Sequence, residues 1–455
     1  MRQTGSVLIR NCEVVATMDE SETELRGASV LIEDGVISWV GAGEPPHRDG
    51  LTQIDGRGMV AMPGMINTHL HLFQTLTRGR AQQGDLFGWL DELYKVWDRH
   101  VDAEWAHAAA LVGLAELALT GCGLTTDHHY LHPRGATGLI EATIEAARAI
   151  GIRFHPTRSA MNLGQKDGAL PPDSLVEDKD EVLAHSEELV ARFHDASAGS
   201  MLQVAVGPCW PLNCTEDLMS DSVKLARRLG IRMHTHIAEP RDEERLTLQR
   251  YGRRPLDFLD SIEMLGSDVW LAHCVQLSEA DIDRTAATRT GVAHCPSSNL
   301  RSGAGIAPVP ALLRAGVRVG IGVDSLALND SGSIVGETRQ ALLVHRVGGL
   351  EEGLTARAAL RMATRGGAAC LGRDDVGSIE AGKRGDVALF DVGGLEFVGA
   401  ESDPLAAVLL CNTHRVKHLW VEGRQIVDDG RLTTMDEERI VSEARQVVSR
   451  IRWPR

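Results

Sequence analysis

Two histidines at alternate positions follow a short apolar run and could bind a metal ion together. The run VAMPGMI, residues 60–66, leads through Asn-Thr into His69-Leu-His71. Side chains two apart on a strand point to the same face, so these two imidazoles would project together. Neutral imidazole is a preferred ligand of Zn²⁺. The pair alone is equally compatible with two histidines that only hydrogen-bond to the backbone.

Three more apolar runs end in residues suited to metal binding or proton transfer. His236 and Glu239 belong to the segment MHTHIAE, His273 ends WLAH, and Asp324 follows VRVGIGV. A catalytic zinc site needs about three or four protein ligands and a place for water. Histidine or aspartate at four separate strand ends is hard to obtain by accident. We therefore predict that these residues converge on one divalent ion and polarise a water molecule.

The elements that would position these residues alternate along the middle of the chain. Strand-like runs are separated by helix-like stretches such as residues 103–122, whose Ala and Leu recur at helical spacing. About eight such units between residues 60 and 370 predict a closed (β/α)8 barrel of the TIM type, with reactive residues at the carboxyl ends of its strands. His128 and His129 would end the second strand and shape the pocket. An open doubly wound sheet is the alternative, but no GxGxxG follows a strand.

Both ends of the chain have a different texture, with short Val- and Ile-rich runs broken by Gly and Asp. We predict an α/β protein in which residues 1–60 and 375–440 form one small composite β-sandwich domain, because chain termini usually lie close together. The barrel would span residues 61–374, and residues 441–455 would form a surface helix on the β domain. Two unrelated β extensions are the alternative.

Composition narrows the range of partners. The 455 residues carry a net charge of −16, which repels polyphosphates and argues against nucleic acid. The eight scattered cysteines are typical of reduced thiols. No segment approaches the ~18 apolar residues of a membrane span, and the N-terminal residues lack a signal-peptide pattern. We expect a cytoplasmic protein that binds a small molecule, with neither nucleic acid nor membrane as partner.

Taken together, the motifs resemble those of the amidohydrolase superfamily, in its cytosine deaminase-like and triazine hydrolase-like branch. The shared elements are HxH, HTHxAE, a strand-end AHC and GVD, and the resemblance runs from VLIRNCEVVATMD to GSIEAGKRGDVALFD. It implies four metal ligands: His69, His71, His236 and Asp324. It also implies that His273 hydrogen-bonds the metal-bound water and that Glu239 moves protons to the substrate ring. His234, the first histidine of HTH, is left as a packing residue.

The same resemblance implies one metal ion in each subunit. Members with two metals bridge them with a carboxylated lysine on the fourth strand, and the segment expected there, MLQVAVGPC, has no lysine. We predict Zn²⁺, because hydrolysis needs no redox change, with Fe²⁺ as the alternative. Barrels of this kind often dimerise, so a homo-oligomer, dimer or higher, is expected.

The implied reaction is a hydrolytic deamination with three catalytic residues. Asp324 would accept the proton of the water, His273 would orient it, and Glu239 would protonate the ring nitrogen beside the attacked carbon. Glu239 must hold a proton near neutral pH, so we predict that its pKa is raised. The alternative from a different class is a non-catalytic scaffold, which predicts missing ligands.

Flanking motifs within the branch most resemble the 8-oxoguanine deaminases, which release urate and ammonia. They include NTHLHLFQTLTRG and LGQKDGALPPDSLVED, whereas GVDSLALND departs from the usual GVDGSASND. The expected substrate is 8-oxoguanine or a related aminated purine or pterin, and s-triazine hydrolysis is the alternative. Gln74, Trp89 and Trp210, with Glu239, are predicted to contact the substrate, and Trp97 could add a flat wall. Packing within the barrel is the alternative for each tryptophan.

Overall fold

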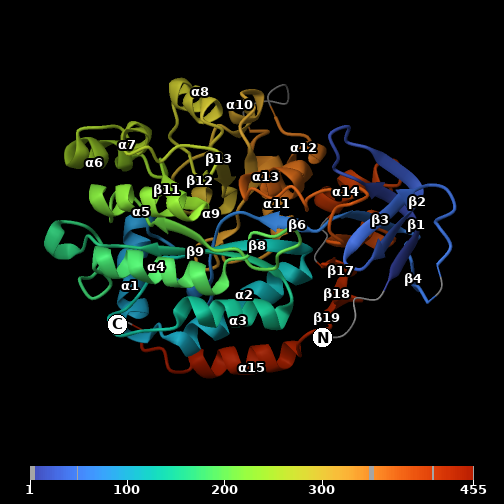
Figure 1. Ribbon diagram of the computed structural model, residues 1–455, viewed down its shortest axis with the longest axis horizontal. Coiled ribbons are helices and arrows are strands. Elements are labelled where there is room, and N and C mark those ends of the chain that lie inside the picture. Colours follow the sequence, from blue (N-terminus) through green and yellow to red (C-terminus); the bar gives the residue numbers. More distant parts are fainter. Residues whose placement is uncertain (1–5, 49, 348–352, 412–414, 454–455) are drawn as a thin grey trace.

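A closed barrel of eight parallel strands forms the centre of the computed structural model, which describes residues 6–48, 50–347, 353–411 and 415–453 (Figure 1). The strands follow one another in chain order, and the last pairs with the first. They are β6 (Met65–Asn67), β8 (Cys122–His129), β9 (Arg153–Ala160), β10 (Ala205–Pro208), β11 (Met233–Ile237), β12 (Val269–His273), β13 (Gly291–His294) and β14 (Val319–Ile321). Every residue of these strands is buried, as expected where helices cover a parallel sheet. The predicted barrel is confirmed.

Helices surround the barrel and connect its strands. They are α1 (Leu86–His100), α2 (Ala103–Leu119), α3 (Leu139–Ile150), α4 (Lys179–Phe193), α5 (Glu216–Leu229), α6 (Asp242–Tyr251), α7 (Pro255–Ser261), α8 (Glu279–Ala287), α9 (Pro296–Arg301), α10 (Val309–Arg314), α11 (Ile334–Val344), α12 (Ala356–Arg361) and α13 (Gly367–Cys370). A further helix, α14 (Pro404–Leu410), connects two strands of the separate sheet beside the barrel. Helix α2 shows the local logic, because Asp102 caps its first turn and Gly121, with φ of 97°, redirects the chain after its end. Within the described ranges, no helix is long and apolar enough to cross a membrane.

Strands from both ends of the chain share one nine-stranded sheet beside the barrel (Figure 1). The N-terminal strands are β1 (Val7–Ala16), β2 (Glu24–Glu33), β3 (Val36–Gly41), β4 (Thr52–Asp55) and β5 (Met59–Pro63). The C-terminal strands are β16 (Val387–Asp391), β17 (His418–Val421), β18 (Arg424–Asp428) and β19 (Arg431–Leu432). The two halves meet where β5 pairs antiparallel with β16. Because β5 continues almost directly into β6, this sheet anchors the strand that leads to the HxH pair.

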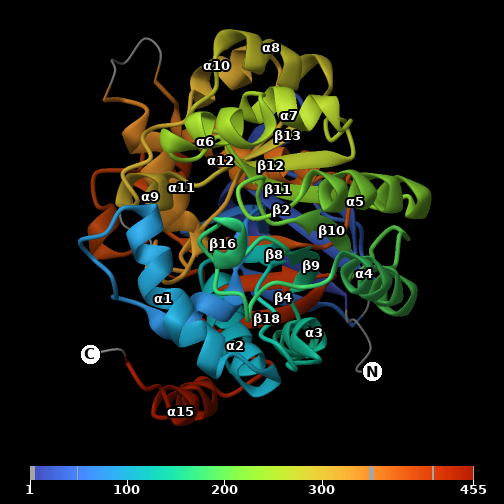
Figure 2. The same cartoon turned by 90° about the vertical axis from the view of Figure 1, so that its left-hand side faces the viewer.

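The C-terminal helix α15 (Glu437–Val448) lies against α2 of the barrel (Figure 2). The predicted packing on the β domain is therefore wrong. The buried face of α15 carries Ile440, Ala444 and Val447, and just beyond its end Arg450 pairs with Glu104 of α2 at 2.6 Å. Helix α2 is rich in Ala and Leu around its circumference, so its outer side also needs an apolar cover.

Arg153, the first residue of β9, joins the barrel to the terminal sheet. Its side chain is fully buried, and its guanidinium donates two hydrogen bonds to Asp386, just before β16, at 3.0 and 2.9 Å. It also donates to the Glu422 carboxylate at 2.8 Å and to the carbonyl oxygens of Gly199 and Ser200 at 2.6 and 2.7 Å. The buried cation is thus paired and hydrogen-bonded on every side, which is the condition for keeping a charge away from water.

Replacing Arg153 with Met should destabilise the protein, because Asp386 would be left buried without its partner. Removing one partner of a buried ion pair costs about 3–5 kcal/mol. Adding Asp386→Asn should recover a large part of that loss, since the orphaned charge is then gone. Urea unfolding followed by circular dichroism measures both variants. If the free energy of unfolding of the single variant Arg153→Met lies within about 1 kcal/mol of that of the unmodified protein, the pair does not have this role.

Candidate active site and metal centre

The four predicted ligands come together at the mouth of the barrel, at the carboxyl ends of its strands. His69 and His71 follow β6, with His71 in β7 (Leu70–His71), and His236 lies in β11. Asp324 begins β15 (Asp324–Ser325), which pairs with β7. The Asp324 Oδ1 atom lies 3.2 Å from His69 Nε2 and 3.3 Å from His71 Nε2. All four residues are buried, so the alternative that predicted missing ligands is not supported.

Two of the predicted ligands, His71 and His236, face each other in an arrangement that suits a cation between them. The Nε2 atoms of His71 and His236 lie 3.0 Å apart. Their Nδ1 atoms lie 2.8 Å from the His128 carbonyl oxygen and 2.7 Å from the Cys209 carbonyl oxygen. A carbonyl only accepts, so each Nδ1 carries the hydrogen and each Nε2 presents a lone pair. Burial lowers the pKa of both imidazoles, which keeps them neutral.

These contacts fit a divalent metal ion. Two lone pairs at hydrogen-bonding distance repel each other, whereas a cation bound by both turns the same contact into two coordinate bonds. The buried His69 Nε2 has no hydrogen-bond partner among the described residues and faces Asp324. Three imidazole nitrogens and one carboxylate match the donor set of a catalytic zinc site. The ligand atoms of His69, His71 and Asp324 lie within 4.8 Å of one another.

Asp324 is held by a strained backbone and a hydroxyl group. Its second carboxylate oxygen accepts a hydrogen bond from Ser298 Oγ, and its amide donates to the His69 carbonyl at 3.0 Å. Asp324, Ala238 and His273 all have positive φ, at 56°, 52° and 71°. Non-glycine residues with positive φ are conformationally strained, and these strained residues lie together at the site.

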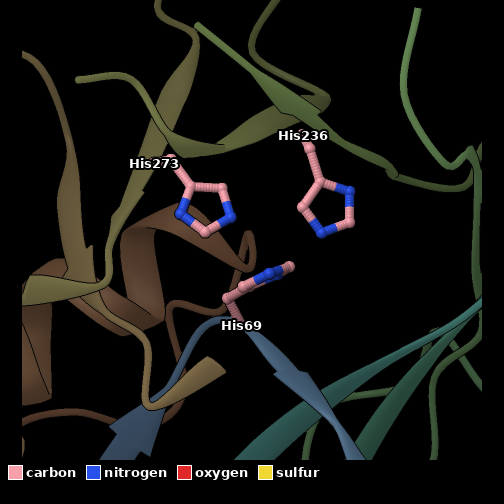
Figure 3. A group of neighbouring side chains, drawn as sticks. All are labelled: His69, His236 and His273. Carbon is pink, nitrogen blue, oxygen red and sulfur yellow. The ribbon is translucent and has the colours of Figure 1, made fainter. Parts of the chain in front are cut away.

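Glu239 and His273 lie next to each other beside the predicted ligands. Their nearest atoms, Oε2 and Nε2, lie 3.6 Å apart, and His273 Nδ1 donates to Asn299 Oδ1 at 2.9 Å. Burial raises the pKa of Glu239 to about 7, in the predicted direction. Burial alone would lower the pKa of His273, but the carboxylates of Glu239 and Asp324 outweigh it and raise that pKa. Figure 3 shows His69, His236 and His273 turned toward one shared space.

Glu243 supports this pair and was missed by the sequence analysis. Its carboxylate accepts hydrogen bonds from the backbone amides of Ala238 and Glu239, at 2.9 and 2.8 Å. Burial raises the pKa of Glu243 to about 7. The contact fixes the turn after β11 and so the direction in which Glu239 points. An acidic residue in the first turn of the helix after HTHIAE was the available signal, but such residues are common on solvated helix ends.

A cavity of about 40 Å³ opens beside the ligands and Glu239. Gln74, Trp89 and Trp210, which are predicted to contact the substrate, line it, whereas Trp97 lies in the core and donates to Thr77 Oγ1 at 3.2 Å. Gln74 Nε2 donates to the hydroxyl of Tyr130, another lining residue, at 2.8 Å. Tyr130 was not predicted, because it follows directly after β8 and belongs to no motif.

His128 lies beside the ligand rings, with its ring centroid 4.7 Å from that of His236. It is not among the residues that line the cavity, so shaping the pocket falls to its backbone, whose carbonyl oxygen holds His71. His129 ends β8, as expected, and packs against Phe73 on the other side of the strand.

A parallel eight-stranded barrel whose mouth gathers buried imidazoles and carboxylates defines a metal-dependent hydrolase. Comparison with known proteins narrows this class. The model of the Amidohydrolase family matches residues 60–426, and the chain belongs to that family.

Similar proteins cover almost the whole chain. An 8-oxoguanine deaminase from Pseudomonas aeruginosa is 41% identical over 423 residues, which is 92% of this chain and 94% of that protein. A hydroxydechloroatrazine ethylaminohydrolase from Pseudomonas sp. strain ADP is 36% identical, over 96% of this chain and 94% of that protein. The crystal structure of atrazine chlorohydrolase from Arthrobacter aurescens TC1, complexed with zinc, superposes with a TM-score of 0.94 at 35% identity. It covers 97% of this chain and 100% of that one.

Proposed function

We propose that the protein hydrolytically deaminates an amino-substituted nitrogen heterocycle, with 8-oxoguanine as substrate and urate and ammonia as products. The observation that carries the proposal is Glu239, a fully buried carboxyl whose pKa is raised to about 7 and which lies beside His273 and the ligand group. Such a group can both give and take a proton at neutral pH. The 41% identity to an 8-oxoguanine deaminase over 92% of the chain supports this substrate.

The proposed metal is one Zn²⁺ per subunit, held by His69, His71, His236 and Asp324, with Fe²⁺ as the alternative. When bound, the ion lowers the pKa of a water molecule from 15.7 to about 7. The zinc in the superposed chlorohydrolase structure supports the choice of metal. A homo-oligomer, dimer or higher, and a cytoplasmic location stay predictions from the sequence.

Each side chain then has a defined task. The Asp324 carboxylate takes the proton of the attacking water, and His273 Nε2 orients that water toward the ring carbon. Glu239 Oε2 gives its proton to the neighbouring ring nitrogen, which relieves the charge that develops there. Asp324 passes the first proton to the amine, which leaves as ammonia, and the hydroxyl proton on the ring carbon returns to Glu239 as the carbonyl group forms. Gln74, Trp89 and Trp210 hold the flat ring in the cavity.

Hydrolysis of an s-triazine is the second candidate function. The 36% identity to a hydroxydechloroatrazine ethylaminohydrolase and the TM-score of 0.94 with an atrazine chlorohydrolase favour it. The same ligands and the same Glu239 would serve, because an aminated triazine also carries a ring nitrogen beside the attacked carbon.

A substrate screen separates the two candidates. Purified zinc-loaded protein is assayed for ammonia release from oxidised purines, guanine, pterins and aminotriazines, and for amine or chloride release from substituted triazines. We expect kcat/KM for 8-oxoguanine within the enzymatic range of about 10⁴–10⁸ M⁻¹s⁻¹ and at least about tenfold above every triazine. A higher value for any triazine would replace the first function with the second, and Glu239→Gln serves as the inactive reference.

A further inference from the structure

The histidines at the barrel mouth form two levels. His69 and His71 lie two apart in the segment that follows β6, and His234 and His236 lie two apart in β11. At the upper level the Nε2 atoms of His71 and His236 are 3.0 Å apart. At the lower level His69 Nδ1 lies 2.7 Å from His234 Nε2. The two contacts look alike, but only the upper one brings two lone pairs together.

Hydrogen positions at the lower level follow from one carbonyl group. His234 Nδ1 lies 2.8 Å from the carbonyl oxygen of Trp270, so it must carry the hydrogen. The Nε2 atom of a neutral His234 is then an acceptor, and His69 Nδ1 must be the donor. His69 is therefore left with its lone pair on Nε2, the atom that faces Asp324. A single relay from Trp270 through His234 thus decides which nitrogen of His69 is free for a metal.

His234 is held too firmly to rotate out of this relay. The side chain is completely buried, and its ring stacks on the Trp270 ring at a centroid distance of 4.4 Å and an interplanar angle of 10°. The Trp270 indole in turn donates to the carbonyl oxygen of Thr68, the neighbour of His69, at 2.9 Å. Ring and backbone are thereby fixed relative to His69.

We propose that His234 is a positioning residue of the metal centre: by accepting a hydrogen bond from His69 Nδ1, it fixes the tautomer and the ring orientation with which His69 Nε2 binds the ion. The role goes beyond the packing for which His234 was predicted. Partners of this kind, which touch no metal themselves, are typically worth 10–100-fold in metal affinity. The proposal rests on the proposed metal centre, but not on the identity of the substrate.

Two substitutions separate positioning from packing. His234→Phe keeps an aromatic ring against Trp270 and removes both nitrogens, whereas His234→Gln loses the stacked ring and keeps one acceptor and one donor. Zinc affinity is measured by competition with a chromophoric chelator, and the visible spectrum of the Co²⁺-loaded protein reports ligand geometry. We expect affinity to fall about 10–100-fold in His234→Phe, with a changed Co²⁺ spectrum. His234→Gln should stay within about threefold of the unmodified protein, with its spectrum retained.

Either of two results would overturn the proposal. One is unchanged zinc affinity in His234→Phe, and the other is a loss of zinc affinity above tenfold in a folded His234→Gln. Circular dichroism checks folding, and if His234→Phe does not fold, the His234→Gln affinity and spectrum alone decide. If the unmodified protein binds zinc and the two variants change its affinity as expected, but no heterocycle is turned over, only the proposed function is refuted. Failure of the unmodified protein to bind zinc or Co²⁺ would refute both.

Discussion

Glu239→Gln should lower kcat by about 10²- to 10⁴-fold while the zinc content stays at that of the unmodified protein. Glutamine has nearly the same shape, but it cannot hold a proton at neutral pH or deliver one to a ring nitrogen. The backbone at this position is fixed by Glu243, so the side chain should keep its place in the cavity wall. Ammonia release gives kcat, and elemental analysis gives metal per subunit.

A matched control lies in the following helix. Glu244 has the same side chain, is only partly buried and pairs with Arg254 outside the cavity. Glu244→Gln should leave kcat within about twofold of the unmodified protein, because the residue touches neither the ligands nor the cavity. Full activity in Glu239→Gln would remove the proton-transfer role. Loss of zinc in that variant would instead show that the glutamate supports metal binding.

His236→Leu should have opposite effects on metal binding and on the stability of the metal-free protein. It removes a ligand, so zinc affinity should fall by at least about 100-fold, and turnover with it. It also removes the repulsion between two lone pairs 3.0 Å apart. The Cys209 carbonyl would keep its contacts with Thr235 Oγ1 and the amide at position 236. Relief of one unsatisfied buried contact is worth about 1–3 kcal/mol, so the metal-free variant should be more stable.

Chelator competition and urea unfolding of metal-free protein measure the two effects. The control is His345→Leu. His345 Nε2 also approaches another imidazole, that of His294, at 3.1 Å, but neither histidine is a candidate metal ligand. Zinc affinity should be unchanged there. If His236→Leu destabilises the metal-free protein, the lone-pair assignment at the upper level is wrong, whatever happens to zinc.

The sequence predicted what depends on order along the chain. Alternating strands and helices indicated the barrel, and alternation within strands placed His69 and His71 together at its mouth. What it could not supply were partners across the barrel. His234 was left to packing because the resemblance assigns the second histidine of HTH to the metal, and the contact with His69, 165 positions away, is not visible in the sequence. Glu243 resembled any acidic residue at a helix start, and the surface covered by α15 depended on which helix presented an apolar outer side.

The junction of β5 with β16 has a consequence for synthesis on the ribosome. The whole barrel separates these two strands in the chain, so the edge of β5 has no β16 partner until every barrel strand has been synthesised. An unpaired strand edge invites association with other chains during that interval. A product shortened before β16 would contain every residue of the metal group and still lack the strand beside β5. Pairing with β16 therefore determines whether the strand that leads to His69 and His71 is firmly supported.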